Sequence, residues 1–294
     1  MCHNMERMNG QITANRQFFK DSVAEEQIIY APLCLNPLMA RIATEVGFKY
    51  GYLSGGALGF ELAISEALLT VNEIREYARQ IISRSKIGLI VDIGVGFGDP
   101  VHTWRAIREL EAVGATAVEI EDQVAPKRVH HHKGVEHLVS SQEMVEKIKE
   151  AVSAREDRTF QIIARTSAIS NESMESALSR AKEYREAGAD VILLQPRDEQ
   201  ELEAIRSHLE PPLALISAPG RWPEETLLES GFRLMFDPFT AQVASVQAVK
   251  TVFETVSRHG SLAELDSMMS EYRKLQIYAG LESLYELEGR TTEK

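Results

Sequence analysis

The sequence of 294 residues is poor in cysteine and has no long hydrophobic run. Two cysteines, Cys2 and Cys34, make no disulfide framework and are typical of a reducing compartment. No apolar stretch approaches the roughly 18 residues that a membrane-spanning helix requires. Residues 1–10 are too polar for a signal peptide. We therefore expect a cytoplasmic protein with no membrane partner.

Positive charge is also scarce, with 32 Lys and Arg residues against 44 Asp and Glu and a net charge of −12. A nucleic-acid partner requires a basic surface, so the composition excludes that class. No stretch of Pro, Gly or Ser is long enough to be a domain linker. Because 44% of the residues are hydrophobic, the chain can bury a large core without a disulfide or a structural metal.

Short apolar segments alternate with longer amphipathic ones along most of the chain. The apolar segments are rich in Ile, Val and Leu without strict alternation, as in strands covered on both faces. Strands are expected at residues 28–34, 50–54, 88–94, 117–122, 160–166, 191–195, 212–217 and 232–236. Helices are expected at residues 37–46, 71–85, 100–112, 141–155, 172–187, 199–209 and 223–230. Capping boxes begin at Thr70 and Ser140.

Eight strands alternating with helices favour a parallel (β/α)8 barrel over a doubly wound sheet. We predict one domain over residues 1–294, with residues 240–294 as a C-terminal helical extension broken near residues 259–261. Such surplus helices usually pack on the barrel or on a neighbouring subunit. A homo-oligomer is therefore expected.

The ends of the predicted strands carry the candidate site, because barrel enzymes place their chemistry there. Ser54, Gly55 and Gly56 follow the second strand, and a Gly-rich turn exposes amides that can hold a carboxylate or phosphate. The alternative is a tight turn with no ligand. Asp92 lies inside an apolar strand, and a buried carboxylate must be paired or bound to metal.

The fourth strand ends with Glu119, Glu121 and Asp122, and alternation places the two glutamates on one face. Asp92 and Glu121 come from neighbouring strands and could together hold Mg²⁺. The alternative for Glu121 is a surface charge at a strand end. Arg165 ends the fifth strand and suits a bidentate carboxylate contact, or else an ion pair with a neighbouring acid.

The loop after the fourth strand is unusually basic for an acidic protein and holds residues 130–132, three consecutive histidines. Three adjacent side chains cannot all face one metal, so we discount a zinc site. One histidine could donate a proton from a lid, or the loop could be solvated. Cys34 lacks a base partner and is expected to pack in the core.

These segments resemble the isocitrate lyase/phosphoenolpyruvate mutase superfamily from about residue 36 to residue 240. Residues 118–127, Val-Glu-Ile-Glu-Asp-Gln-Val-Ala-Pro-Lys, are similar to the most recognisable motif of that family, and residues 162–166 to its strand-five arginine motif. Ser54-Gly55-Gly56 resembles the turn that holds the substrate carboxylate. The resemblance is to a methylisocitrate lyase-like or oxaloacetate decarboxylase-like member with a divergent site.

The resemblance implies a barrel whose final helix is exchanged between subunits of a dimer or tetramer. It also implies Mg²⁺-assisted cleavage of a carbon–carbon bond in a small 2-oxo or 2-hydroxy carboxylic acid through an enolate. The implied site residues divide by role. They are catalytic Asp92, Glu121, Lys127, His131 and Arg165, substrate-binding Ser54, Gly55, Gly56 and Arg165, and metal-binding Asp92 and Glu121.

The sequence departs from the family at four positions. Ser65 and Gly94 stand where acids are usual, which reduces the expected metal shell, and Gln195 replaces a glutamate. Val129 stands where the lyases carry a cysteine acid. Three alternatives therefore stay open. They are a catalytically silent barrel acting as a binding or scaffold subunit, C–P bond chemistry on a phosphonopyruvate-like substrate, and new chemistry on a substrate larger or less acidic than those of the family.

Overall fold

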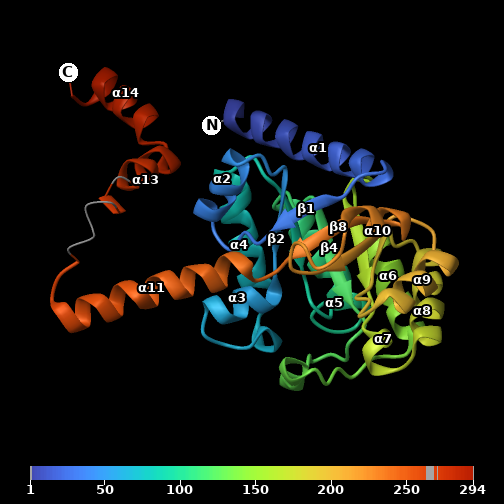
Figure 1. The fold of residues 1–294 in the computed structure, drawn as a ribbon. Helices are drawn as coiled ribbons and strands as arrows, with labels where there is room; N and C mark the ends of the chain where they lie inside the picture. Colours follow the sequence, from blue (N-terminus) through green and yellow to red (C-terminus); the bar gives the residue numbers. More distant parts are fainter. Residues whose placement is uncertain (1, 263–267, 270, 294) are drawn as a thin grey trace. The chain divides into compact units, whose positions relative to one another are not determined.

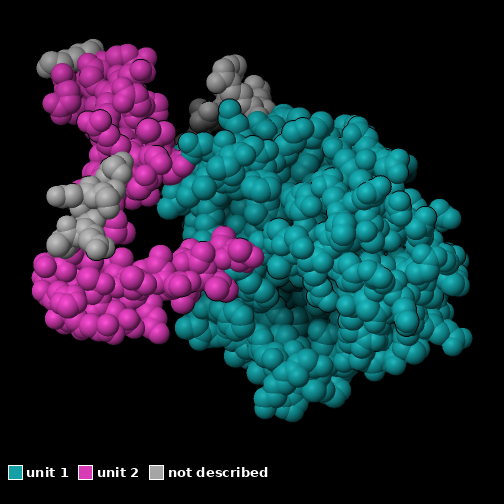
Figure 2. All heavy atoms as spheres, in the orientation of Figure 1, with its two compact units in different colours: residues 1–239 teal, residues 240–294 magenta. Residues whose placement is uncertain are grey.

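The computed structural model describes residues 2–262, 268–269 and 271–293. The chain divides into two compact units, Met1–Phe239 and Thr240–Lys294, coloured separately in Figure 2. Within the described residues no helix is both long and apolar enough to cross a membrane.

Unit 1 is built on eight parallel strands that form one sheet (Figure 1). They are β1 Ile29–Pro32, β2 Tyr50–Leu53, β3 Gly88–Asp92, β4 Ala117–Glu121, β5 Gln161–Arg165, β6 Val191–Leu193, β7 Leu213–Ile216 and β8 Phe232–Asp237. The sheet follows chain order from β2 to β8, and β8 pairs with β1. A parallel bridge between Leu33 and Tyr52 joins β1 to β2, and the Cys34 amide donates to the Tyr52 carbonyl at 2.9 Å. The predicted (β/α)8 barrel is therefore confirmed.

Helices connect the strands and surround them. In unit 1 they are α1 Cys2–Ala24, α2 Pro37–Glu45, α3 Gly55–Glu61, η1 Glu66–Leu68, α4 Val71–Arg84, α5 Pro100–Ala112, η2 Val129–Lys133, α6 Ser141–Ala154, α7 Ala168–Asn171, α8 Met174–Glu186, α9 Glu199–His208 and α10 Glu224–Glu229. Their starts follow local chemistry. Thr70 and Glu73 form the complete capping box predicted, whereas the Ser140 hydroxyl accepts from the Glu143 amide without a reciprocal bond.

The helix expected at residues 172–187 is confirmed as α8, which starts two residues later, and a separate short helix, α7, precedes it. A short α7 ends before Glu172, and α8 starts after Ser173, whose hydroxyl accepts from the Ser176 amide. Ser173 has an extended backbone, as a helix N-cap requires, so the chain cannot be helical across this point.

The barrel interior has its own apolar cluster, which includes Tyr52, Ile90 and Ile163. Two side chains of α1, Phe19 and Val23, join that cluster and are almost fully buried. The sequence patterns did not predict α1. Its residues are mostly polar, and its role in closing one end of the barrel depends on these two apolar side chains. Arg16 secures the helix by donating to the carbonyls of Glu111 and Ala115, at 2.7 and 2.9 Å.

Unit 2 contains α11 Thr240–His259, α13 Tyr272–Ala279 and α14 Leu281–Thr291. The predicted break is confirmed, because α11 ends before Gly260, which has a φ of 65°. The rest of the expected helical extension partly falls on residues 263–267 and 270, which lie outside the described residues.

Candidate active site

The predicted site residues converge where the strands of unit 1 end. Asp92 is the last residue of β3, Glu121 of β4 and Arg165 of β5. Lys127 and His131 come from the loop that follows β4. The register explains part of this proximity, because Glu121 lies directly beside Arg165 in the parallel pair of β4 and β5.

Asp92 is buried and is held by backbone amides rather than by a side-chain partner. Its Oδ1 accepts from the Gly94 amide at 2.8 Å, and its Oδ2 accepts from the Gly55 amide at 3.0 Å. Burial and the nearby Glu66 carboxylate raise the pKa of Asp92 above its ordinary value. The carboxylate thereby joins the end of β3 to the segment after β2.

The Ser54-Gly55-Gly56 segment is not the open turn that the glycines suggested. Gly55 begins α3, and the Ser54 hydroxyl accepts from the Ala57 amide at 3.3 Å. The glycines permit close packing, because a Cβ on Gly55 would lie 3.1 Å from oxygens of both Asp92 and Glu66. The Gly55 amide is therefore committed to Asp92, while the segment remains in contact with Asp92 and Glu66.

Glu119 and Glu121 both point to the inner side of β4, as alternation predicts. Arg165 Nη1 donates to Glu119 Oε1 at 3.3 Å and lies 3.5 Å from Glu121 Oε2. The Tyr52 hydroxyl also donates to Glu119. Burial and the Asp92 charge raise the pKa of Glu119 to about 8, although Arg165 opposes that shift.

Arg165 is only partly satisfied by these contacts. Its Nη2 donates to Gln195 Oε1 at 3.3 Å, whereas its buried Nε has no hydrogen-bond acceptor within the part of the chain that the structure describes. A buried donor without an acceptor is costly, so this atom is an available contact for a bound oxygen.

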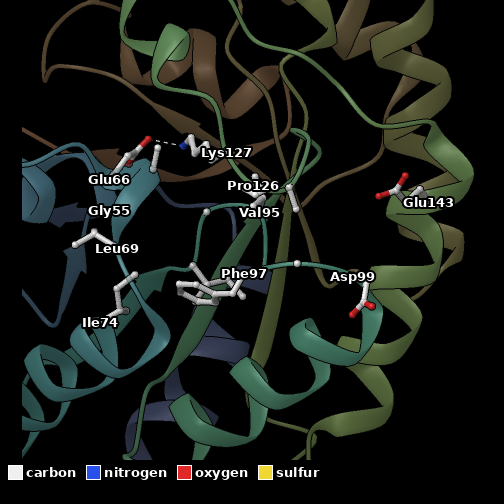
Figure 3. Close-up of a pocket in the computed structure, with 15 residues that line it drawn as sticks. Gly55, Glu66, Leu69, Ile74, Val95, Phe97, Asp99, Pro126, Lys127 and Glu143 are labelled. Carbon is white, nitrogen blue, oxygen red and sulfur yellow. Dashed lines mark hydrogen bonds and ion pairs between the residues drawn. The ribbon is translucent and has the colours of Figure 1, made fainter.

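Glu66, in η1, is the acid that the sequence analysis missed. It pairs with Lys127, as Figure 3 shows, and its Oε1 lies 2.8 Å from His131 Nε2. Although burial opposes ionisation, the bonds from His131 and Lys127 hold the pKa of Glu66 down to about 2. Ser65, the position compared with the family, instead contacts His132 on the loop, with 2.9 Å between Oγ and Nε2.

The histidine loop does reach the site. His131 is 9% exposed, and its Nδ1 lies 2.6 Å from the Arg128 carbonyl oxygen. Burial disfavours its charged form, but the contacts with Glu66 and Arg128 outweigh that effect and raise the pKa of His131. Val129, by contrast, is 53% exposed and lies away from the buried contacts.

The carboxylates do not form a ready site for a divalent ion. Mg²⁺ prefers octahedral oxygen coordination, but Gly94 supplies no side-chain donor and both Asp92 oxygens accept amides. The Lys127 ammonium contacts both Glu66 and Glu121. Across the described residues, no group of three or more Asp, Glu, His or Cys side chains is arranged to hold a metal.

A cavity of about 380 Å³ opens beside this cluster (Figure 3). Gly55, Glu66 and Lys127 line one side, and Leu69 and Phe97 contribute apolar walls. The space is sufficient for a small organic acid, and it places such a ligand next to the buried charges.

Comparison with known proteins supports a family assignment. The sequence profile described as phosphoenolpyruvate phosphomutase matches residues 19–257. A 2-methylisocitrate lyase of Aeropyrum pernix is 35% identical over 267 residues, covering 88% of this chain and 84% of the relative. A 2,3-dimethylmalate lyase of Eubacterium barkeri is 30% identical, covering 92% and 95% of the two chains. The crystal structure of a phosphonopyruvate hydrolase complexed with oxalate and Mg²⁺ is 30% identical with a TM-score of 0.86, covering 95% of this chain and 99% of that one.

Proposed function

Because this chain belongs to the isocitrate lyase/phosphoenolpyruvate mutase superfamily, we propose that it is a lyase breaking a carbon–carbon bond in a small 2-oxo or 2-hydroxy carboxylic acid. A 2-methylisocitrate lyase and a 2,3-dimethylmalate lyase are similar to this chain over most of its length. One observation of the site carries the proposal. Two cations, Arg165 and Lys127, lie among buried carboxylates at the ends of β3, β4 and β5.

Retro-aldol cleavage and decarboxylation share one demand on the site, and retro-aldol cleavage also needs a base that takes the hydroxyl proton, a role open to an ionised carboxylate of this cluster. The electron pair of the breaking bond passes to the adjacent carbon and spreads onto a carbonyl oxygen as an enolate. Fixed positive groups in a water-poor site stabilise such charge more strongly than solvent does. Arg165 and Lys127 supply these groups, and the free Nε of Arg165 is a donor for a substrate oxygen.

The remaining residues bind the substrate carboxylate and protonate the enolate. The Ser54 hydroxyl and the Gly56 amide, at the start of α3, hold the substrate carboxylate, while Asp92 fixes the backbone of Gly55 and Gly94 around them. His131 returns the proton to the enolate carbon, since contacts at both ring nitrogens favour its protonated form. Glu121 positions Lys127 and Arg165.

A substrate panel tests the proposal. The purified chain is mixed with oxaloacetate, 2-methylisocitrate, 2,3-dimethylmalate and phosphonopyruvate, and 2-oxo acid release is followed. We expect turnover of at least one C–C substrate, loss of that turnover in Asp92→Ala, and unchanged turnover in the exposed control Glu175→Ala. Turnover of phosphonopyruvate alone would favour C–P chemistry. No turnover at all would favour the silent-barrel alternative, whereas full activity of Asp92→Ala would contradict the proposed site.

We also propose that unit 2 associates with a second copy of the chain. Five apolar side chains of α11 recur at intervals of three or four residues, which places them on one helix face. They are exposed: Val243, Val246, Val249, Phe253 and Val256. Light scattering after size exclusion should show a dimer or tetramer, and Phe253→Asp should lower its mass. A monomer at all concentrations would contradict the proposal.

A further inference from the structure

Lys127 occupies an unusual place for a lysine. Its side chain is 8% exposed, and its ammonium pairs with Glu66 and lies 2.5 Å from Glu121 Oε1. These two acids are supplied by different segments, η1 and the end of β4. Figure 3 shows the Lys127 side chain directed at Glu66 along the margin of the cavity.

The charge of this lysine is matched by the two acids. The Lys127 ammonium pairs with the Glu66 carboxylate and with the Glu121 carboxylate, which also lies 3.5 Å from Arg165 Nη1. The cluster therefore holds an ammonium ion between two buried carboxylates, where it balances their charge.

The Lys127 ammonium supplies the positive charge that a divalent ion supplies in other clusters of carboxylates. It contacts two carboxylates at once, and it lies beside the cavity next to Arg165. Gly94, which would be the further ligand, has no side chain, and a Cβ placed there would meet nothing within 4 Å. The missing oxygen is therefore a property of the sequence, and no neighbouring side chain fills its place.

We propose that the ammonium group of Lys127 is the resident cation of this site and that the chain carries out its reaction without a divalent metal ion. The proposal rests on the function proposed above. Lys127 donates to the developing enolate oxygen when the substrate displaces part of its contact with Glu66 or Glu121. Glu66 is then a positioning residue, whose carboxylate holds the Lys127 ammonium in place. It lies one residue after Ser65, the position at which an acid is usual in the family.

The structure also indicates how a metal site could be created. Gly94 has a φ of 52°, in the left-handed region, which aspartate tolerates better than most residues. The open space there accepts a carboxylate. Lys127→Met combined with Gly94→Asp removes the ammonium and adds a donor beside Asp92 and Glu121, so this double variant should bind Mg²⁺ where the natural sequence does not.

Calorimetry with Mg²⁺ alone, on the full-length chain, tests the proposal without reference to turnover. We expect no binding up to millimolar Mg²⁺ for the natural chain, and none for Lys133→Met, which removes an exposed lysine from the same loop. Binding of one ion to the double variant is the expected positive result. Stoichiometric binding to the natural chain would overturn the proposal. Thermal unfolding shows that each variant is folded.

Turnover adds a second readout, using whichever acid the substrate panel identifies. We expect activity to change less than twofold in excess EDTA, a fall of about 100-fold or more in Lys127→Met, and partial recovery in Lys127→Arg, which keeps the charge. Lys133→Met should match the natural chain. Loss of activity in EDTA that Mg²⁺ restores would overturn the proposal. If no substrate is turned over, the proposed function fails, and calorimetry still decides the question of the cation.

Discussion

Two buried charge clusters lie on opposite faces of the chain at the end of β4. The inner cluster contains Glu121, and the outer cluster contains Asp122, the next residue in the sequence. On the outer side, Asp122 Oδ2 accepts from the Tyr184 hydroxyl at 2.7 Å and from Arg180 Nη1 at 3.3 Å. Arg180 also donates to the Val139 carbonyl and pairs with Glu172, at 2.9 and 2.7 Å. On the inner side, Glu121 shares its cations with Glu66 and Glu119.

The two clusters differ in how completely they are satisfied. The outer one is closed by hydrogen bonds that join the end of β4, α8 and the end of the histidine loop, and none of its residues lines the cavity beside the inner cluster. The inner one leaves the Arg165 Nε without an acceptor among the described residues and borders a cavity of about 380 Å³. Burial of charge alone therefore does not identify a reactive site, whereas a charge cluster that borders a cavity and contains an unsatisfied donor is a candidate for one.

The largest effect is expected from a substitution that disrupts the outer cluster. Arg180→Met leaves Asp122 and Glu172 without their cation, and an uncompensated buried charge costs about 3–5 kcal/mol of unfolding free energy. Urea unfolding measures this loss. The folded fraction should keep its KM for the substrate, because Arg180 contacts no part of the cavity. A variant with unchanged stability would contradict the structural role of the outer cluster.

The inner cluster should respond in activity as well as in stability, because Arg165 pairs with buried carboxylates and also borders the proposed reaction site. Arg165→Met removes the donor proposed for the enolate, and we expect kcat/KM to fall about 10²- to 10³-fold. Steady-state kinetics and urea unfolding on the same preparation separate the two effects. If Arg165→Met lost stability as Arg180→Met does and kept its activity, the contrast between the two faces would be wrong.

Packing around the acids gives a smaller effect. Gly55→Ala places a Cβ 3.1 Å from oxygens of Asp92 and Glu66, so these groups must shift, at a cost of about 1–3 kcal/mol. Activity should fall with stability. Gly10→Ala is the matched control, because its Cβ meets nothing within 4 Å in α1, and it should stabilise the chain by about 0.4–1 kcal/mol. Equal effects of the two changes would exclude a packing requirement at Gly55.

The smallest effect concerns a third ion pair, at the opposite end of the barrel. Asp157 Oδ2 lies 3.2 Å from Arg16 Nη1. Burial opposes ionisation, but bonds from Thr159 and Arg16 lower the pKa of Asp157. The pair therefore stabilises the fold above the unfolded-state pKa, and that contribution is lost as the pH falls through the lowered value. Urea unfolding should show Asp157→Asn to be less stable by up to about 1 kcal/mol at pH 7, with the difference vanishing in acid. A difference that grew in acid would reverse the assigned sign.

Several parts of the site could be predicted from the sequence because they depend on local rules. Asp92 and Arg165 end apolar strands, and parallel strands in a barrel bring such ends together. Alternation placed Glu119 and Glu121 on one face, as observed, although it did not single out Glu119 as a partner of Arg165. The roles assigned to these residues remain proposals.

Other features had no local signal. Glu66 lies in a short 3-10 turn, and nothing in its neighbours indicates that its carboxylate meets Lys127, 61 residues away. The glycines after β2 suggested an open turn, whereas the structure uses them to start α3 against two carboxylates. The α1 helix was missed because its burial rests on few side chains, Phe19 and Val23 among them.

The sequence by itself therefore determined the order of strands and helices, the closed parallel barrel, and which acids and cations stand at the strand ends. These follow from hydrophobic periodicity, capping and the geometry of parallel strands, all of which act over a few residues. Only the tertiary structure decided which charges meet. Placing Lys127 between Glu66 and Glu121, and leaving Gly94 facing open space, depends on loops that approach one another from distant parts of the chain. The partner of each charged side chain is set by which groups lie near it in space, because electrostatic interactions depend on distance in space and not on separation along the sequence.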